Sequence, residues 1–202
     1  MPNLRLSGGL GLYYKGFGSS YVRKVATISD TGSRGVTKYT DIRLSEYYRK
    51  FGADLLYMDY KGFYLTEPGK HGYSSGDPET KRSDMRLKTV SATGFYLFSD
   101  EFSLRAAFIQ NERQNKWDWT LLAVFSVVYQ SLESRYSIIP PENEAAFGDN
   151  AGLKDGVFKG AAAGAGFGVT VPYNDYLFAV VSYFGSGYMY RVYQIDDGEK
   201  TD

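Results

Sequence analysis

The segment from Lys159 to Val171, KGAAAGAGFGVTV, alternates with a period of two. Glycine occupies the even positions 160, 164, 166 and 168, and every odd position from 161 to 171 carries alanine, phenylalanine or valine. A period of two sends successive side chains to opposite faces of a β-strand. The segment therefore predicts a strand with an apolar face and a glycine face, and the bare glycine face leaves space for bulky side chains or for a passing solute.

Two other glycine-rich structures do not fit this segment. A dinucleotide-binding loop needs G-x-G-x-x-G spacing before a helix, but Val169 stands where the third glycine is required. A pair of packed membrane helices needs G-x-x-x-G within about 20 apolar residues. Gly160 and Gly164 have this spacing, yet Lys159 and the polar residues before it interrupt the apolar stretch. Only the strand accounts for every position.

Similar alternation along the chain predicts eight or nine strands and no helix of usable length. Many of them exceed the usual five or six residues of soluble strands, and a bilayer requires about 9–11 residues per tilted strand. The fold class expected for this single domain of 202 residues is all-β, an antiparallel up-and-down transmembrane β-barrel with about eight to ten strands. The predicted strands are 4–14, 17–25, 38–48, 51–65 with a bulge near Leu55, 84–98, 102–112, 119–132, 157–171 and 176–193.

The connections between these strands are of two kinds. Residues 29–35, 66–83 and 133–156 are long polar loops, whereas Ser99-Asp100 and 172–175 are tight turns. Short turns on one rim and long loops on the other are typical of outer-membrane barrels. The two tight turns are separated by three predicted strands, which puts them on opposite rims. Either one rim carries both kinds of connection, or one predicted strand is wrong.

Composition restricts the function. The formal net charge is zero and no basic excess is present, which argues against nucleic acid as a partner. Cysteine is absent. The chain has no run of about 18 apolar residues, so no membrane helix is expected. Aromatic residues make up 17% of the chain and gather near strand ends, which is typical of aromatic girdles at a membrane interface. In the alternative interpretation they cap the strand ends of a soluble barrel.

Charged residues inside the predicted strands indicate a polar interior. Arginine or lysine on the lipid face at mid-bilayer costs about 2–4 kcal/mol, so such residues are expected to face the lumen. A salt-bridge network that fills the interior is favoured over a substrate channel, because a barrel of about eight strands holds only side chains or one small ligand. The predicted lumenal polar network consists of Asp41, Arg43, Asp54, Asp59, Arg86, Lys88, Arg105, Glu112 and Arg113.

The sequence offers little for catalysis or metal binding. His71 is the one histidine, and Ser74 and Ser75 lie beside it in a glycine-rich loop without a G-x-S-x-G motif. One histidine and no cysteine disfavour a transition-metal site, and no calcium-loop spacing is present. We therefore expect no catalytic residues, no metal and no cofactor.

Four segments carry a family resemblance: GLGLYYKGFG at 9–18, residues 37–65, AAFIQNERQNK at 106–116, and residues 137–140. Together they resemble an uncharacterised family of outer-membrane β-barrel proteins from Bacteroidetes-type bacteria. The residues that map onto it are Tyr39, Asp41, Asp54, 59–64 and 112–114. The resemblance implies the outer membrane of a Gram-negative cell, and a longer protein with a signal peptide and flanking strands, of which 1–202 is a partial barrel domain. It implies no activity.

The leading hypothesis is thus an outer-membrane β-barrel, porin-like and non-catalytic. Its role would be structural, or binding or passage of a small molecule, with membrane lipid as its partner. The first alternative is a soluble β-barrel around an apolar ligand, which requires inward-facing Leu4, Leu6, Leu10, Leu12, Ala161, Ala163 and Ala165. The second is a barrel-embedded enzyme that acts on lipid with His71 and a loop serine.

Overall fold

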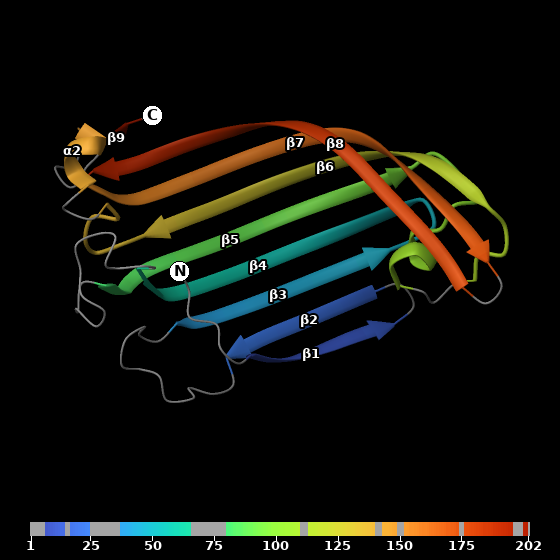
Figure 1. Cartoon of the computed structure of the whole chain (residues 1–202), viewed down its shortest axis with the longest axis horizontal. Coiled ribbons are helices and arrows are strands. Elements are labelled where there is room, and N and C mark those ends of the chain that lie inside the picture. Colours follow the sequence, from blue (N-terminus) through green and yellow to red (C-terminus); the bar gives the residue numbers. More distant parts are fainter. Residues whose placement is uncertain are drawn as a thin grey trace.

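The structure, a computed structural model, describes residues 7–14, 17–24, 37–65, 80–109, 113–139, 143–148, 152–173, 176–195 and 200–201. Nine strands form one sheet in this part of the chain, and each pairs antiparallel with the next in sequence (Figure 1). They are β1 (Ser7–Tyr14), β2 (Phe17–Lys24), β3 (Lys38–Tyr47), β4 (Phe51–Tyr64), β5 (Lys81–Leu97), β6 (Asp118–Glu133), β7 (Leu153–Tyr173), β8 (Tyr176–Ile195) and β9 (Lys200–Thr201). The predicted all-β, up-and-down architecture is confirmed.

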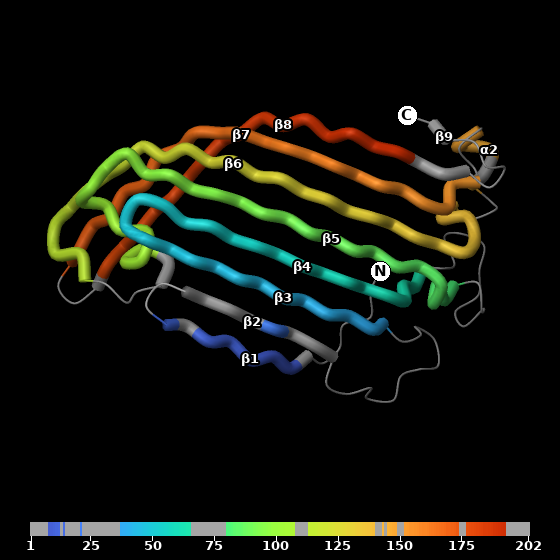
Figure 2. The backbone as a smooth tube through the Cα atoms, turned by 180° about the vertical axis from the view of Figure 1, so that it is seen from behind, coloured from blue at the N-terminus to red at the C-terminus, as the bar shows by residue number. Residues whose placement is uncertain are grey.

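The sheet is open. Among the described residues no pairing joins β1 to β8 or β9, and β9 pairs with β8 only at Tyr193 and Gln194. Figure 2 shows β1 and β8 at opposite margins of the curved sheet. The described strands therefore form a curved wall and not a closed barrel.

The connections sort into two ends because each strand reverses direction. One end, which we call the turn end, carries the β1–β2, β3–β4 and β7–β8 connections, where Tyr14 pairs with Phe17, Tyr48 N donates to Phe51 O, and Tyr173 pairs with Tyr176. The connection from β5 to β6, residues 98–117, is also at this end. The opposite end, the loop end, carries the β2–β3, β4–β5, β6–β7 and β8–β9 connections. Three of the four turn-end connections between the described strands are short, whereas three of the four loop-end connections are long, the β8–β9 connection being the exception.

The predicted strand 102–112 is wrong. Residues 105–109 form a short π-helix, η3 (Arg105–Ile109). The hydroxyl of Ser103 accepts a hydrogen bond from Ala106 N at 3.2 Å, and Ala107 N donates to Ser103 O at 3.1 Å. The serine therefore begins a helical turn where the apolar alternation suggested a strand. Without this strand, Ser99-Asp100 and residues 172–175 lie at the same end, and the conflict between the rims disappears.

Other element boundaries agree with expectation to within four residues where the structure describes them, although β5 and β7 begin inside the segments predicted as loops. Residues 4–6 and 25 of the predicted strands lie outside the described residues. The apolar segment 119–132 is a strand, as predicted, within β6. The bulge expected near Leu55 is absent, and β4 is instead irregular between Lys61 and Phe63, where Gly62 has a φ of 90°. Glycine adopts this left-handed conformation without the strain that a Cβ would cause. The described helices, η3 and α2 (Glu144–Phe147), are both too short to cross a membrane.

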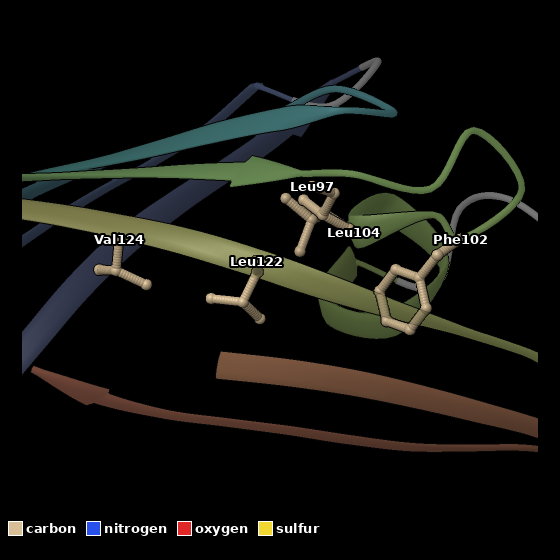
Figure 3. Close-up of a cluster of buried hydrophobic side chains, with 5 residues drawn as sticks. All are labelled: Leu97, Phe102, Leu104, Leu122 and Val124. Carbon is tan, nitrogen blue, oxygen red and sulfur yellow. The ribbon is translucent and has the colours of Figure 1, made fainter. Parts of the chain in front are cut away.

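A small apolar cluster lies on one face of the sheet at the turn end (Figure 3). Leu97 of β5 and Leu122 and Val124 of β6 pack against Phe102 and Leu104 of the 102–109 segment. Leu104 is 1% exposed. Gly168 of β7 touches this segment too, because a Cβ there would lie 2.8 Å from Cζ of Phe102. The 102–109 segment thus covers one face of the sheet at its turn end.

The glycines of the segment from Lys159 to Val171 lie on β7, as the alternation predicts, and they allow the backbone of β8 to approach β7 closely. A Cβ at Gly166 would lie 2.1 Å from the carbonyl oxygen of Ser182, and one at Gly164 would lie 2.3 Å from that of Phe184. The space beside Gly164 and Gly166 is therefore taken by the backbone of β8.

Candidate functional site

One face of the sheet is apolar over most of its width. The register sets Leu55 of β4 opposite Ala92 of β5, Ala92 opposite Val127 of β6, and Val127 opposite Ala161 of β7. Residues directly opposite one another share a face, which we call the apolar face. Its larger exposed side chains are Leu10, Leu12, Tyr14, Tyr21, Phe51, Leu55, Tyr57, Val90, Tyr96, Trp119, Leu121, Phe125, Val127, Tyr129, Phe167, Val171, Tyr173, Phe178, Val180, Phe184, Tyr188 and Tyr190.

The opposite face, which we call the polar face, carries hydrogen-bonded side chains in the middle of the sheet. Thr93 and Ser126 are cross-strand partners whose hydroxyl oxygens lie 2.8 Å apart. Gln130 Nε2 donates to Thr89 Oγ1 at 3.1 Å. These groups satisfy one another across β5 and β6, and the 102–109 segment covers the same face at the turn end.

A tyrosine and a glycine pair across β3 and β4 on the polar face. Tyr47 is the partner of Gly52, and a Cβ on Gly52 would lie 2.5 Å from Cδ1 of the ring. The ring lies over the bare backbone of the glycine, and its hydroxyl donates to Asp54 Oδ1 and Oδ2 at 2.7 and 2.9 Å. Gly52 therefore lets Tyr47 reach Asp54.

An ion pair and an aromatic stack extend this face along β3. Arg43 Nε and Nη2 donate to the two oxygens of Asp41 at 3.0 and 3.2 Å. The Arg43 side chain is 61% exposed and that of Asp41 is 9% exposed, so a largely buried carboxylate is paired with a solvent-exposed guanidinium. Tyr39 stacks on Tyr60 with ring centroids 5.3 Å apart.

The residues of the predicted network do not form one network. Asp41, Arg43 and Asp54 lie on the polar face, but Asp59, Arg86 and Lys88 share the face of Leu55 and Tyr57, at its loop end. Arg86 donates to Asp59 at 2.8 and 2.5 Å, and Lys88 reaches Glu133 at 3.3 Å. Arg105 belongs to η3 and Arg113 to the β5–β6 connection, both at the turn end. Glu112 lies outside the described residues.

A tight polar cluster at the loop end was missed from the sequence. Arg82 donates to both oxygens of Asp84, at 3.1 and 2.9 Å, and to the carbonyl of Ser137 at 2.7 Å. Asp84 also accepts hydrogen bonds from the Ser134 hydroxyl and from Arg135 N. Arg82 and Asp84 have the same parity on β5, so their shared face was the available signal.

The electrostatics of Asp84, which lies before the apolar stretch of β5, follow from these contacts. Burial raises the pKa of Asp84, but hydrogen bonds from Arg82 and Ser134 and the charge of Arg82 outweigh it and hold the pKa far below its usual range. Asp84 is therefore a charged anchor for residues 134–137.

The family model of a domain of unknown function, DUF4421, matches residues 1–202. This chain belongs to the DUF4421 family. No curated protein and no solved structure matches it. Membership in an uncharacterised family is thus confirmed, and the outer-membrane location remains a prediction.

The apolar face of this DUF4421 domain contains a shallow groove of about 350 Å³ across β3–β6. Nearly all of its lining is apolar, and the lining residues are Ile42, Leu44, Leu55, Leu56, Tyr57, Val90, Ser91, Ala92, Val127, Val128 and Tyr129. The groove ends beside the rows that carry Asp59, Lys88 and Arg86. An apolar groove next to charges can bind an amphiphile.

No metal-binding group is present in the described part of this DUF4421 domain, where no three His, Cys, Asp or Glu residues gather in suitable geometry. His71, Ser74 and Ser75 lie outside the described residues. The polar groups with defined geometry are therefore paired side chains on the two faces of the sheet.

Proposed function

We propose that this chain forms the wall of an outer-membrane β-barrel in a Gram-negative cell envelope. Its apolar face contacts lipid, its polar face lines the lumen, and its role is non-catalytic: structural, or the binding or passage of a small molecule. The exposed apolar face carries this proposal. Soluble monomers rarely expose contiguous apolar patches larger than a few hundred Å², and here such side chains extend from β1 to β8.

The height of the apolar face fits a bilayer. On β6 it extends from Trp119 to Tyr129, about 34 Å along the strand at about 3.4 Å per residue. With a tilt of about 40° this becomes about 25 Å across the membrane, the usual height of the apolar band in such barrels.

Aromatic side chains border the apolar face at both ends, as girdles do. Toward the loop end, Tyr21, Tyr57, Tyr129 and Tyr190 belong to one cross-strand row. Toward the turn end, the exposed aromatic side chains include Phe98, Trp117, Trp119 and Tyr173. Amphipathic rings prefer the membrane–water interface, which supports this orientation.

The connection lengths give further support. Outer-membrane barrels have short turns on one rim and long loops on the other. Between the described strands, three of the four turn-end connections are short and three of the four loop-end connections are long. In this proposal both open edges of the sheet require partner strands, because unpaired backbone groups are not tolerated in hydrocarbon.

The soluble-barrel alternative receives no comparable support. It requires seven residues to point into a protected interior: Leu4 and Leu6, which lie outside the described residues, and Leu10, Leu12, Ala161, Ala163 and Ala165. Leu10 is 84% exposed, Leu12 is 64% exposed, and the three alanines are also exposed. For the lipid-acting enzyme, His71, Ser74 and Ser75 all lie outside the described residues, so no described contact supports it.

Adjacent substitutions in β5 test the proposal. Ala92 lies mid-height on the apolar face and Ser91 on the polar face. Arginine on the lipid face at mid-bilayer costs about 2–4 kcal/mol, so Ala92→Arg should lower the unfolding free energy in phosphocholine vesicles by that amount. Ser91→Arg, the matched control, should change it by less than about 1 kcal/mol. Denaturant titration in vesicles measures both.

Two results would contradict the proposal. One is equal destabilisation by Ala92→Arg and Ser91→Arg. The other is recovery of a folded wild-type monomer from aqueous buffer without detergent. The proposal predicts instead the heat-dependent gel mobility of a membrane barrel.

A further inference from the structure

Three cations stand directly opposite one another at the loop end of the apolar face. Lys38 of β3 pairs in register with Lys61 of β4, and Lys61 pairs with Arg86 of β5. Like charges directly opposite on neighbouring strands destabilise a sheet. Arg86 is compensated by Asp59, but exposed Lys38 and Lys61 form no ion pair with any described residue. Among the described residues, this row therefore carries more positive charge than its partners neutralise.

The adjacent row adds charge of both signs. Lys88 is opposite Asp59, and it binds Glu133 on β6. The four cations Lys38, Lys61, Arg86 and Lys88 face two carboxylates, Asp59 and Glu133, and two positive charges remain. An anion between Lys38 and Lys61 would remove their repulsion.

The apolar groove lies next to these charges on the same face, toward the turn end. Val90 lines the groove, and Lys88 follows on the same face of β5 after a two-residue step of about 7 Å. Tyr57 lines it on β4, and Lys61 lies about 14 Å further along that strand. The two elements together match an amphiphile with a negatively charged head and an apolar chain.

We propose that this surface binds an anionic lipid through its phosphate. The phosphate lies between Lys38 and Lys61 beside Arg86, and an acyl chain occupies the groove on β3–β6. This inference rests on the proposed membrane location. It adds a specific lipid contact to the general apolar surface, at a place where the sheet has an unmatched positive charge.

Retention of lipid in detergent micelles tests this site with the full chain. Micelles are doped with equal amounts of phosphatidylglycerol and phosphatidylcholine that carry identical acyl chains, and bound lipid is counted by native mass spectrometry. Each lysine near an anionic lipid surface contributes about fivefold in affinity. We expect wild-type protein to retain phosphatidylglycerol preferentially, and the Lys38→Gln/Lys61→Gln variant to lose about thirtyfold in affinity for it.

Controls distinguish a specific lipid site from its alternatives. Lys116→Gln, an exposed lysine at the turn end, should leave the preference unchanged. Inorganic phosphate in excess should compete weakly, because it lacks the acyl chain. Equal retention of the two lipids by wild-type protein, or complete displacement by inorganic phosphate, would overturn the inference. Failure of the wild type to insert into vesicles would instead refute the proposed function.

Discussion

Replacing Gly166 by alanine tests whether the backbone of β8 approaches β7 as closely as the structure shows. The added methyl would lie 2.1 Å from Ser182 O and 2.6 Å from the Cα of Tyr183. Both atoms are backbone, so no side-chain rotation relieves the contact, and β8 must move by about 1 Å to restore ordinary carbon–oxygen spacing. Overpacking of this kind costs about 1–3 kcal/mol, and a backbone clash belongs at the upper end.

A second glycine supplies the matched control. A Cβ on Gly94 in β5 would have Phe125 O as its nearest neighbour, at 4.0 Å. Removing a glycine from a strand interior lowers the entropy lost on folding, so Gly94→Ala should be neutral or stabilise by up to about 1 kcal/mol. Gly166→Ala should therefore be less stable than Gly94→Ala by about 2–4 kcal/mol.

Denaturant unfolding of the two variants and the wild type in the same lipid or detergent measures this difference. Equal midpoints and equal slopes for Gly166→Ala and Gly94→Ala would refute the reasoning, because the contact between β7 and β8 would then be looser than described. A normal slope with a lowered midpoint for Gly166→Ala would locate the effect in stability and not in compactness.

Three further substitutions address other parts of the fold. Leu104→Ala should cost about 2–5 kcal/mol and expose the 102–109 segment to protease, because Leu104 is fully buried; unchanged cleavage would contradict its packing. Asp84→Asn should cost about 1–3 kcal/mol at pH 7 in denaturant titrations. Because the folded pKa of Asp84 is lowered, its stabilisation is complete above the unfolded value of about 4 and is lost as the pH falls through the folded value, so the two proteins should converge in acid. Tyr47→Phe removes the hydroxyl that donates to Asp54 and should lower the unfolding free energy by about 1–2 kcal/mol in denaturant titrations. A neutral effect would show that this hydrogen bond contributes nothing to stability.

The strands could be predicted where one face is consistently apolar, because a one-residue slip would reverse every side chain. β7 is the clearest case: Ala161, Ala163, Ala165, Phe167 and Val171 are exposed and Val169 is half-buried, whereas Gly168 and Thr170 are buried. The strand predicted at 102–112 was wrong for a local reason. Phe102, Leu104 and Ala106 alternate, but Ser103 caps a helical turn, and all three apolar residues are buried, with Phe102 and Leu104 packed against β5 and β6. Alternation over so few residues does not separate the two structures.

The candidate polar residues were only partly predictable. Assigning strand charges to the lumen relies on the cost of a charge at mid-bilayer, and that cost falls to about 0–1 kcal/mol near the interface. Asp59 has the same parity as Leu55 and Tyr57, so alternation alone puts it on the apolar face. Register, which no single strand reveals, brings it to Arg86 and sets Lys38 opposite Lys61. The lipid site therefore required cross-strand pairing to be recognised.

The position of the 102–109 segment bears on which non-catalytic role is favoured. Phe102 and Leu104 lie on the polar face at the turn end and reach four strands there, through Gly52 of β4, Leu97 of β5, Leu122 of β6 and Gly168 of β7. In a barrel this segment would stand across the lumen, and the close approach of β8 to β7 would narrow the space beside it. A solute could pass the turn end only if the segment moved away from a buried cluster. Binding or a structural role therefore agrees better with this packing than free passage does.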